Sequence, residues 1–105
     1  MEKVVNIEKC FEKFHELFTP KIIAEVNGQH FKIVRLDGDK IPWHTHEGPG
    51  PRYVVKGKLK VIEGGKINTY TAGQVFWESG HLMSVENMGE DSAELIIFEL
   101  APMAN

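Results

Sequence analysis

The sequence predicts an all-β domain with one short helix near its N-terminal end, and two observations favour this fold class. From Lys21 onward, short runs rich in Val, Ile, Phe and Tyr are separated by turns that contain glycine. Many short strands at such close spacing are typical of a sandwich or a barrel. No long helical pattern alternates with these runs, which excludes a doubly wound parallel sheet.

Composition limits the classes of function. The 105 residues suffice for one hydrophobic core. A net charge of -3 without a dense Lys/Arg cluster argues against nucleic acid as a partner. No apolar run approaches the roughly 20 residues of a membrane span. The first residues lack a secretory signal pattern, and the single cysteine fits a reducing compartment, so we expect a cytoplasmic protein.

Apolar residues at spacings of three and four predict an amphipathic helix over residues 7–18. Asn6 is its predicted N-cap, and Pro20 follows its end. Within the helix, we expect Cys10 to pack as a small hydrophobe and His15 to face solvent. We therefore divide the chain into an N-terminal arm, residues 1–19, and a barrel domain, residues 20–105.

The strand pattern begins with a predicted hairpin. Its turn is Asn27-Gly28, a dipeptide typical of two-residue hairpin loops, and His30 beside it is expected to face solvent. The predicted strands are 22–26, 31–36, 53–55, 59–62, 67–70, 74–77 and 94–100.

A histidine pair follows the second predicted turn. His44 and His46 lie one residue apart between a Pro-Trp step and a glycine-proline loop. Positions i and i+2 of a strand share a face, so the two imidazoles would lie side by side as metal ligands. Neutral imidazole suits several transition metals, and the pair alone does not identify one.

The spacing of glycines around this pair resembles the cupin superfamily. Gly38, the His44-Thr45-His46 run and Gly57 are similar to its first motif, and Gly73, Gly80 and Asn87 are similar to its second. The resemblance covers roughly residues 20–100. It implies an antiparallel double-stranded β-helix, or jelly-roll barrel, that holds a divalent transition metal through His, His, Glu and His. Zinc, nickel, iron, manganese and copper are not distinguished.

Two of those four ligands are replaced here. The family's glutamate falls at Gly50 and its third histidine at Met83. Three nearby side chains offer substitutes for the missing ligands. These are Glu47 in the irregular loop, His81 on the same face of an extended segment as position 83, and the thioether of Met83, which favours copper(I).

Arg52 is expected inside the barrel. If position 50 points inward, as its family counterpart does, Arg52 and Val54 also point inward. A buried guanidinium needs an anionic partner, which could be Glu78, Glu47, or the carboxylate or phosphate of a ligand. The expected apolar walls of this pocket are Val54, Phe76, Trp77 and Phe98, although strand alternation prevents Phe76 and Trp77 from both facing inward.

Three functions remain open from the sequence. The first is a metal-dependent enzyme acting on a small, possibly anionic, organic molecule, with the dioxygenase or isomerase chemistry that the resemblance implies. The second is a barrel that binds or senses a small molecule without catalysis, and the third is a structural dimer whose pocket has no function. In each case the exposed sheet edges and the apolar helix predict a homodimer.

Overall fold

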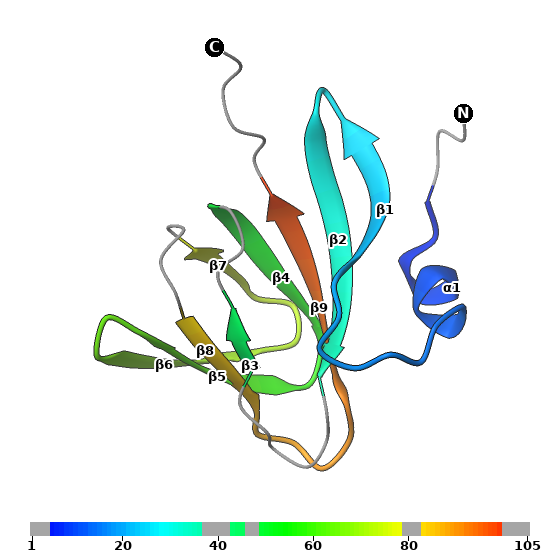
Figure 1. Ribbon diagram of the computed structural model, residues 1–105. Helices are drawn as coiled ribbons and strands as arrows, with labels where there is room; N and C mark the ends of the chain where they lie inside the picture. The colour runs from blue at the N-terminus through cyan, green and yellow to red at the C-terminus, as the bar shows by residue number, and fades with distance from the viewer. Residues whose placement is uncertain (1–4, 37–42, 46–48, 79–82, 100–105) are drawn as a thin grey trace.

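The computed structural model describes residues 5–36, 43–45, 49–78 and 83–99. These ranges contain one helix and nine strands, which form two antiparallel sheets (Figure 1). The five-stranded sheet has the order β1-β2-β9-β4-β7, and the four-stranded sheet has the order β3-β8-β5-β6. The bounds are α1 Ile7–Glu12, β1 Lys21–Val26, β2 Gln29–Leu36, β3 Trp43–Thr45, β4 Gly50–Lys56, β5 Lys58–Glu63, β6 Lys66–Thr71, β7 Val75–Glu78, β8 Met83–Asn87 and β9 Ala93–Glu99. The predicted all-β jelly-roll fold is confirmed.

The hydrophobic core lies between the two sheets. Every strand pair is antiparallel, so alternate residues of each strand point toward the other sheet, and we call this side the inner face. The inner residues of both sheets form one buried cluster: Val34, Leu36, Val54, Phe76, Ala93, Leu95 and Ile97 from the first sheet, and Leu59, Val61, Met83 and Val85 from the second.

Helix α1 is shorter than predicted, ending at Glu12 instead of Phe18. Its N-cap is Asn6 as expected, with the side-chain oxygen accepting from the amide of Lys9 at 2.9 Å. Arg35 accounts for the early end of the helix. Continuation would join the amide of Phe18 to the carbonyl of Phe14, but the carbonyl of Arg35 accepts from Phe18 at 2.8 Å. The guanidinium of Arg35 donates to the Phe14 carbonyl at 2.7 Å.

The β1–β2 hairpin has the predicted turn. Asn27 and Gly28 both have positive φ, 51° and 77°, as a two-residue hairpin loop requires.

Strand β9 lies at the centre of the five-stranded sheet, joined to β2 on one side and to β4 on the other (Figure 1). Residues of β2 and β4 therefore point to the same face of the sheet as the β9 residues with which they pair. The sequence did not predict β8 as a separate strand.

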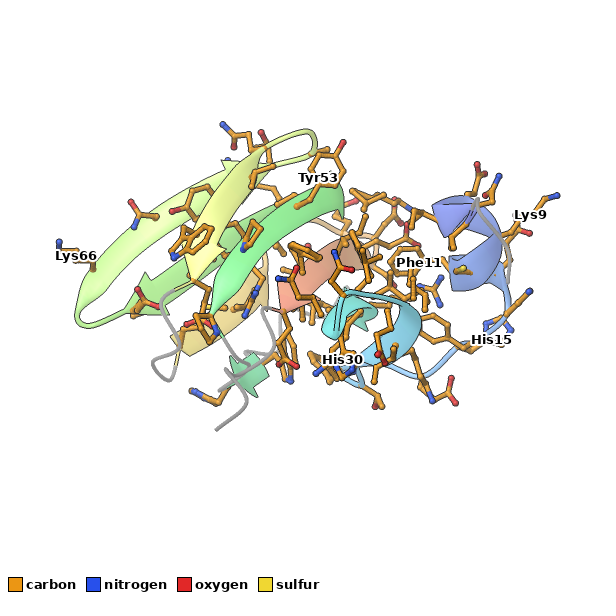
Figure 2. All side chains as sticks on the ribbon, turned by 90° about the horizontal axis from the view of Figure 1, so that it is seen from above. Lys9, Phe11, His15, His30, Tyr53 and Lys66 are labelled. Carbon is orange, nitrogen blue, oxygen red and sulfur yellow. The ribbon has the colours of Figure 1, made fainter. Side chains whose placement is uncertain are left out.

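Helix α1 lies on the outer face of the five-stranded sheet. Arg35 is on that face because its neighbours Val34 and Leu36 belong to the core, and it donates to the carbonyl of Phe11 at 2.9 Å. Figure 2 shows α1 and Lys66 at opposite ends of the molecule. The described part of the chain contains no helix with the length and apolar character of a membrane span.

Candidate functional site

The predicted metal ligands that the structure describes do not share a face. His44 lies on β3 opposite Ser84 of β8, and its side chain is exposed. The next residue pair, Trp43 and Val85, faces the core, and Met83 is buried there too. His44 thus points away from the side on which Met83 lies. His46, Glu47 and His81 are outside the described residues, so the predicted His44–His46 pair stays a prediction.

The backbone explains why position 50 carries no side chain. Gly50 has φ +147°, and a Cβ attached to it would overlap the carbonyl oxygen of Phe98 on β9. L-residues rarely adopt such positive φ values. A glutamate at position 50 would therefore require β4 and β9 to move apart. Because Gly50 opens β4 opposite Glu78 of β7, the carboxylate at this level of the sheet comes from the neighbouring strand.

Arg52 and Glu78 form a buried ion pair on the inner face. Arg52 Nη2 donates to Glu78 Oε2 at 2.9 Å, and the two side chains are 0% and 1% exposed. Of the partners weighed for Arg52, the structure shows Glu78. Each charge of a buried ion pair is stabilised by the other, so removing one member of such a pair lowers the free energy of unfolding by about 3–5 kcal/mol.

Further charged residues extend this pair across the inner face. Lys32 of β2 and Arg52 of β4 both lie opposite Ile97 of β9, one on each side, so the two cations flank a core residue. Two residues further along β9, Glu99 lies opposite His30. Lys32 Nζ is 3.2 Å from Glu99 Oε1.

His30 belongs to this charged group, although the sequence predicted a solvent-facing strand end. Its Nδ1 is 3.7 Å from Glu99 Oε1, and its Nε2 is 3.6 Å from Glu25 Oε2. Sequence reasoning missed His30, Lys32 and Glu99 as inner-face residues. Lys32 and His30 share a face of β2 with Val34 and Leu36, but the opposite face carries Phe31 and Ile33, so the sequence alone does not say which face points inward.

The structure separates the predicted pocket walls into two groups. Val54 and Phe76 are buried on the inner face with Arg52, and the ring of Phe76 stacks on Tyr70 with centroids 4.4 Å apart. Trp77 points to the outer face, which answers the choice between Phe76 and Trp77. Phe98 also lies on the outer face, because its neighbours Ile97 and Glu99 are on the inner one.

Residues 33–99 match the model of a protein family described as the cupin domain. The chain belongs to the cupin domain family. This match includes the inner-face residues from Arg52 to Glu99 and excludes α1.

Two solved structures share the fold of this cupin, and a curated protein matches part of its sequence. A cupin-2 domain protein from Shewanella frigidimarina has a TM-score of 0.73 at 24% identity, with 92% of this chain and 94% of that chain covered. A protein from Neisseria meningitidis has a TM-score of 0.76 at 21% identity, with 95% and 100% covered. The chloroplastic Rubisco accumulation factor 1 of Oryza sativa subsp. japonica is 30% identical over 81 residues. That match covers 76% of this cupin but only 17% of the rice protein.

Cupins often bind metals, and the described side chains can be tested for such a site. Within residues 5–36, 43–45, 49–78 and 83–99, no three His, Cys, Asp or Glu side chains gather as metal ligands. Gly50 excludes the usual glutamate, and Glu78 at the same level of the sheet is bonded to Arg52. The described residues therefore do not by themselves fit a transition metal, and we derive no chemical step through one.

Proposed function

We propose that this cupin binds a small organic anion at the charged end of its barrel, with Arg52 and Lys32 supplying the positive charge. The observation that carries the proposal is the placement of both cations on the inner face, on either side of Ile97. A site that served packing alone would favour apolar side chains there, because burying charged groups costs free energy.

The chemistry of Arg52 favours a carboxylate or a phosphate as the bound group. A guanidinium presents N–H donors in a planar fork that matches two oxygens at once. Val54 and Phe76 on the same face supply the apolar surface usual for small-molecule sites. In this proposal, Glu78 and Glu99 hold the cations in place before the ligand arrives.

Calorimetric titration of a small panel tests the proposal: succinate, citrate and inorganic phosphate, with neutral succinamide as the uncharged match for succinate. Binding should be lost when Arg52→Leu and Glu78→Leu are combined, a change that removes the ion pair without leaving one charge buried. Arg52→Lys keeps the charge but loses the planar fork, so affinity should fall about tenfold.

The control variant is Lys66→Gln, which removes one exposed positive charge on β6, an edge strand of the sheet that does not contain Arg52. It should bind like the wild type. Equal anion affinity in the wild type and in the double Leu variant would remove Arg52 from the site.

A divalent transition metal held by His44 and His46, completed by His81 or Glu47, stays a separate prediction from the resemblance to cupins. Met83, the third substitute, is excluded because it lies in the core, on the other side of the sheet from His44. Elemental analysis of protein purified without a His-tag tests it, and a stoichiometric metal that is lost in His44→Ala would support it. A metal-dependent reaction of the dioxygenase or isomerase type belongs to that version of the function. If no stoichiometric metal is found after reconstitution, anion binding would be the only one of these functions that remains.

The remaining predictions from composition concern location and partners. We expect this cupin to act in the cytoplasm, in line with its single cysteine. We expect no membrane partner because its apolar runs are short, and no nucleic-acid partner because its net charge is -3.

A further inference from the structure

His30 lies between two carboxylates that come from the strands on either side of it. In the sheet register it is opposite Glu25 of β1 and opposite Glu99 of β9. Nε2 of its ring is 3.6 Å from Glu25 Oε2, and Nδ1 is 3.7 Å from Glu99 Oε1. Each ring nitrogen therefore has a carboxylate oxygen of its own nearby.

The charge of the imidazole decides how many of these carboxylates it can bind. A neutral ring carries one N–H and donates on one side at most, whereas a protonated ring carries two. Both distances lie just beyond the range of an N–H···O hydrogen bond, about 2.7–3.2 Å, so a small shift of the side chains closes them. Protonated His30 can therefore hold both carboxylates at once.

Glu99 has a second cationic neighbour, the ammonium of Lys32. Lys32 Nζ is 3.2 Å from Glu99 Oε1 and 3.3 Å from Glu99 Oε2, so it contacts both oxygens of the carboxylate. The Oε1 atom is the one that also faces His30. Lys32 and His30 thus share one anion, and a positive charge on His30 reduces how far Glu99 neutralises Lys32.

Burial keeps these interactions from being fully screened by water. The side chains of Lys32 and Glu99 are 15% and 21% exposed, and partly buried charges are screened less than surface ones. The side chain of His30 is 35% exposed, which is open enough to exchange a proton with solvent. A change of charge at His30 therefore acts on the neighbouring pair.

We propose that His30 is a positioning residue that sets the anion affinity of this cupin through Glu99 and Lys32. When His30 is protonated, Glu99 turns toward the ring and the charge of Lys32 acts on the bound anion. Imidazole ordinarily changes its charge between about pH 5 and 8. Because added positive charge favours an anion, affinity should rise as the pH falls through this range. The inference rests on the anion site proposed above and adds its regulation.

Charged side chains face His30 from each strand packed against it. They are Glu25 of β1, Lys32 of β2 itself and Glu99 of β9. The side chain of Glu25 is 63% exposed, so solvent weakens its interaction with His30. Arg52 lies on β4, beyond β9. Glu99 is therefore the group through which the charge of His30 acts on the ligand.

Calorimetric titration of succinate at pH 6 and at pH 8 tests the proposal. The ratio of the two affinities should be about fivefold larger in the wild type than in His30→Gln, which cannot take up the proton. Comparing proteins in this way cancels the titration of succinate itself. The matched control is His15→Gln, an exposed histidine that lies apart from His30 and should keep the wild-type ratio (Figure 2).

Glu99→Gln tests the route through Glu99. This change keeps an acceptor oxygen for Lys32 but removes the negative charge. The variant should bind succinate at pH 8 about as tightly as the wild type does at pH 6, and its affinity should vary with pH no more than in His30→Gln. Wild-type pH dependence in Glu99→Gln would refute the route, and a purely structural role of His30 would not raise the affinity at pH 8.

Carbon-13 NMR of the Glu99 carboxylate gives a readout without ligand. Its chemical shift should change over the same pH range as the ring signals of His30, and His30→Gln should remove that change. A Glu99 signal that does not respond to His30 would overturn the coupling even if succinate binds.

Failure of this proposal differs from failure of the anion site. Arg52-dependent binding of succinate with the same pH ratio in the wild type and in His30→Gln would refute the role of His30 and leave the site intact. If succinate, citrate and phosphate all fail to bind at both pH values, the anion site is refuted, and its regulation with it. Equal loss of pH dependence in His15→Gln and His30→Gln would place the effect outside the Glu99 contacts.

Discussion

Replacing Gly50 by alanine should destabilise this cupin by about 3 kcal/mol. An L-residue at φ +147° costs roughly 1–2 kcal/mol in backbone strain. The added Cβ would overlap the Phe98 carbonyl oxygen, so β4 and β9 must shift by about 1 Å, and overpacking of this kind costs about 1–3 kcal/mol. Urea unfolding measures the difference, and the thermal midpoint should fall by roughly 15 °C.

Gly73→Ala separates the two contributions. Gly73 also has positive φ, +91°, but nothing lies within 4 Å of a Cβ placed there. This variant should lose only the strain contribution of about 1–2 kcal/mol. If Gly50→Ala proves no less stable than Gly73→Ala, β4 and β9 do not approach as closely as the structure indicates. Our explanation for the missing glutamate would then be wrong.

Three further predictions concern the ion pair and the helix. Arg52→Leu alone should lower the free energy of unfolding by about 3–5 kcal/mol, because it leaves the carboxylate of Glu78 buried without its cation. Adding Glu78→Leu should restore most of this loss in urea unfolding, and a double variant no more stable than the single one would contradict the reasoning. Arg35→Ala should release α1, which would appear as faster amide hydrogen exchange over residues 5–20 with little change in β4. Arg35→Lys should not restore the slow exchange, because an ammonium lacks the planar fork that reaches two carbonyls. Unchanged exchange would refute the role of Arg35. Asn6→Ala should lower the free energy of unfolding by about 1 kcal/mol, and Asn6→Asp should lower it very little, since aspartate caps a helix equally well. Equal losses of stability in circular dichroism melts would show that the side-chain oxygen does not cap α1.

The charged inner face illustrates what local sequence can predict. Arg52 could be assigned to the interior because it lies two residues from both Gly50 and Val54, and strand alternation places all three on one side. Its partner could not be chosen, since Glu47 and Glu78 were both available in the sequence. The pairing of β4 with β7 decides for Glu78, and that pairing is a tertiary feature.

Strand β2 shows where strand alternation gives no answer. Phe31 and Ile33 are apolar on one face, and Val34 and Leu36 are apolar on the other. Both faces are partly covered, the inner one by the second sheet and the outer one by α1, so either parity fits the sequence. The position of His30 beside the Asn27-Gly28 turn predicted a solvent-facing residue, whereas its ring nitrogens lie near two carboxylates.

The length of α1 could not be predicted for a similar reason. The apolar spacing continues to Phe18, and helical periodicity alone would carry the helix that far. Arg35, 21 residues after Phe14 in the sequence, binds the Phe14 carbonyl, and its own carbonyl accepts from Phe18. A contact over that distance is invisible to a local pattern.

The central position of β9 has a consequence for how the chain folds. Strands β2 and β4 are synthesised first, yet each needs β9 as its neighbour, and the facing residues Arg35 and Glu94 are 59 residues apart. Contacts between such distant segments make folding slow, because the long loop must close before any pairing rewards it. At a translation rate of about 5–20 residues per second, β2 and β4 would wait several seconds on the ribosome with apolar inner residues unpaired. We therefore expect the strand edges of this nascent chain to be open to aggregation until β9 is synthesised.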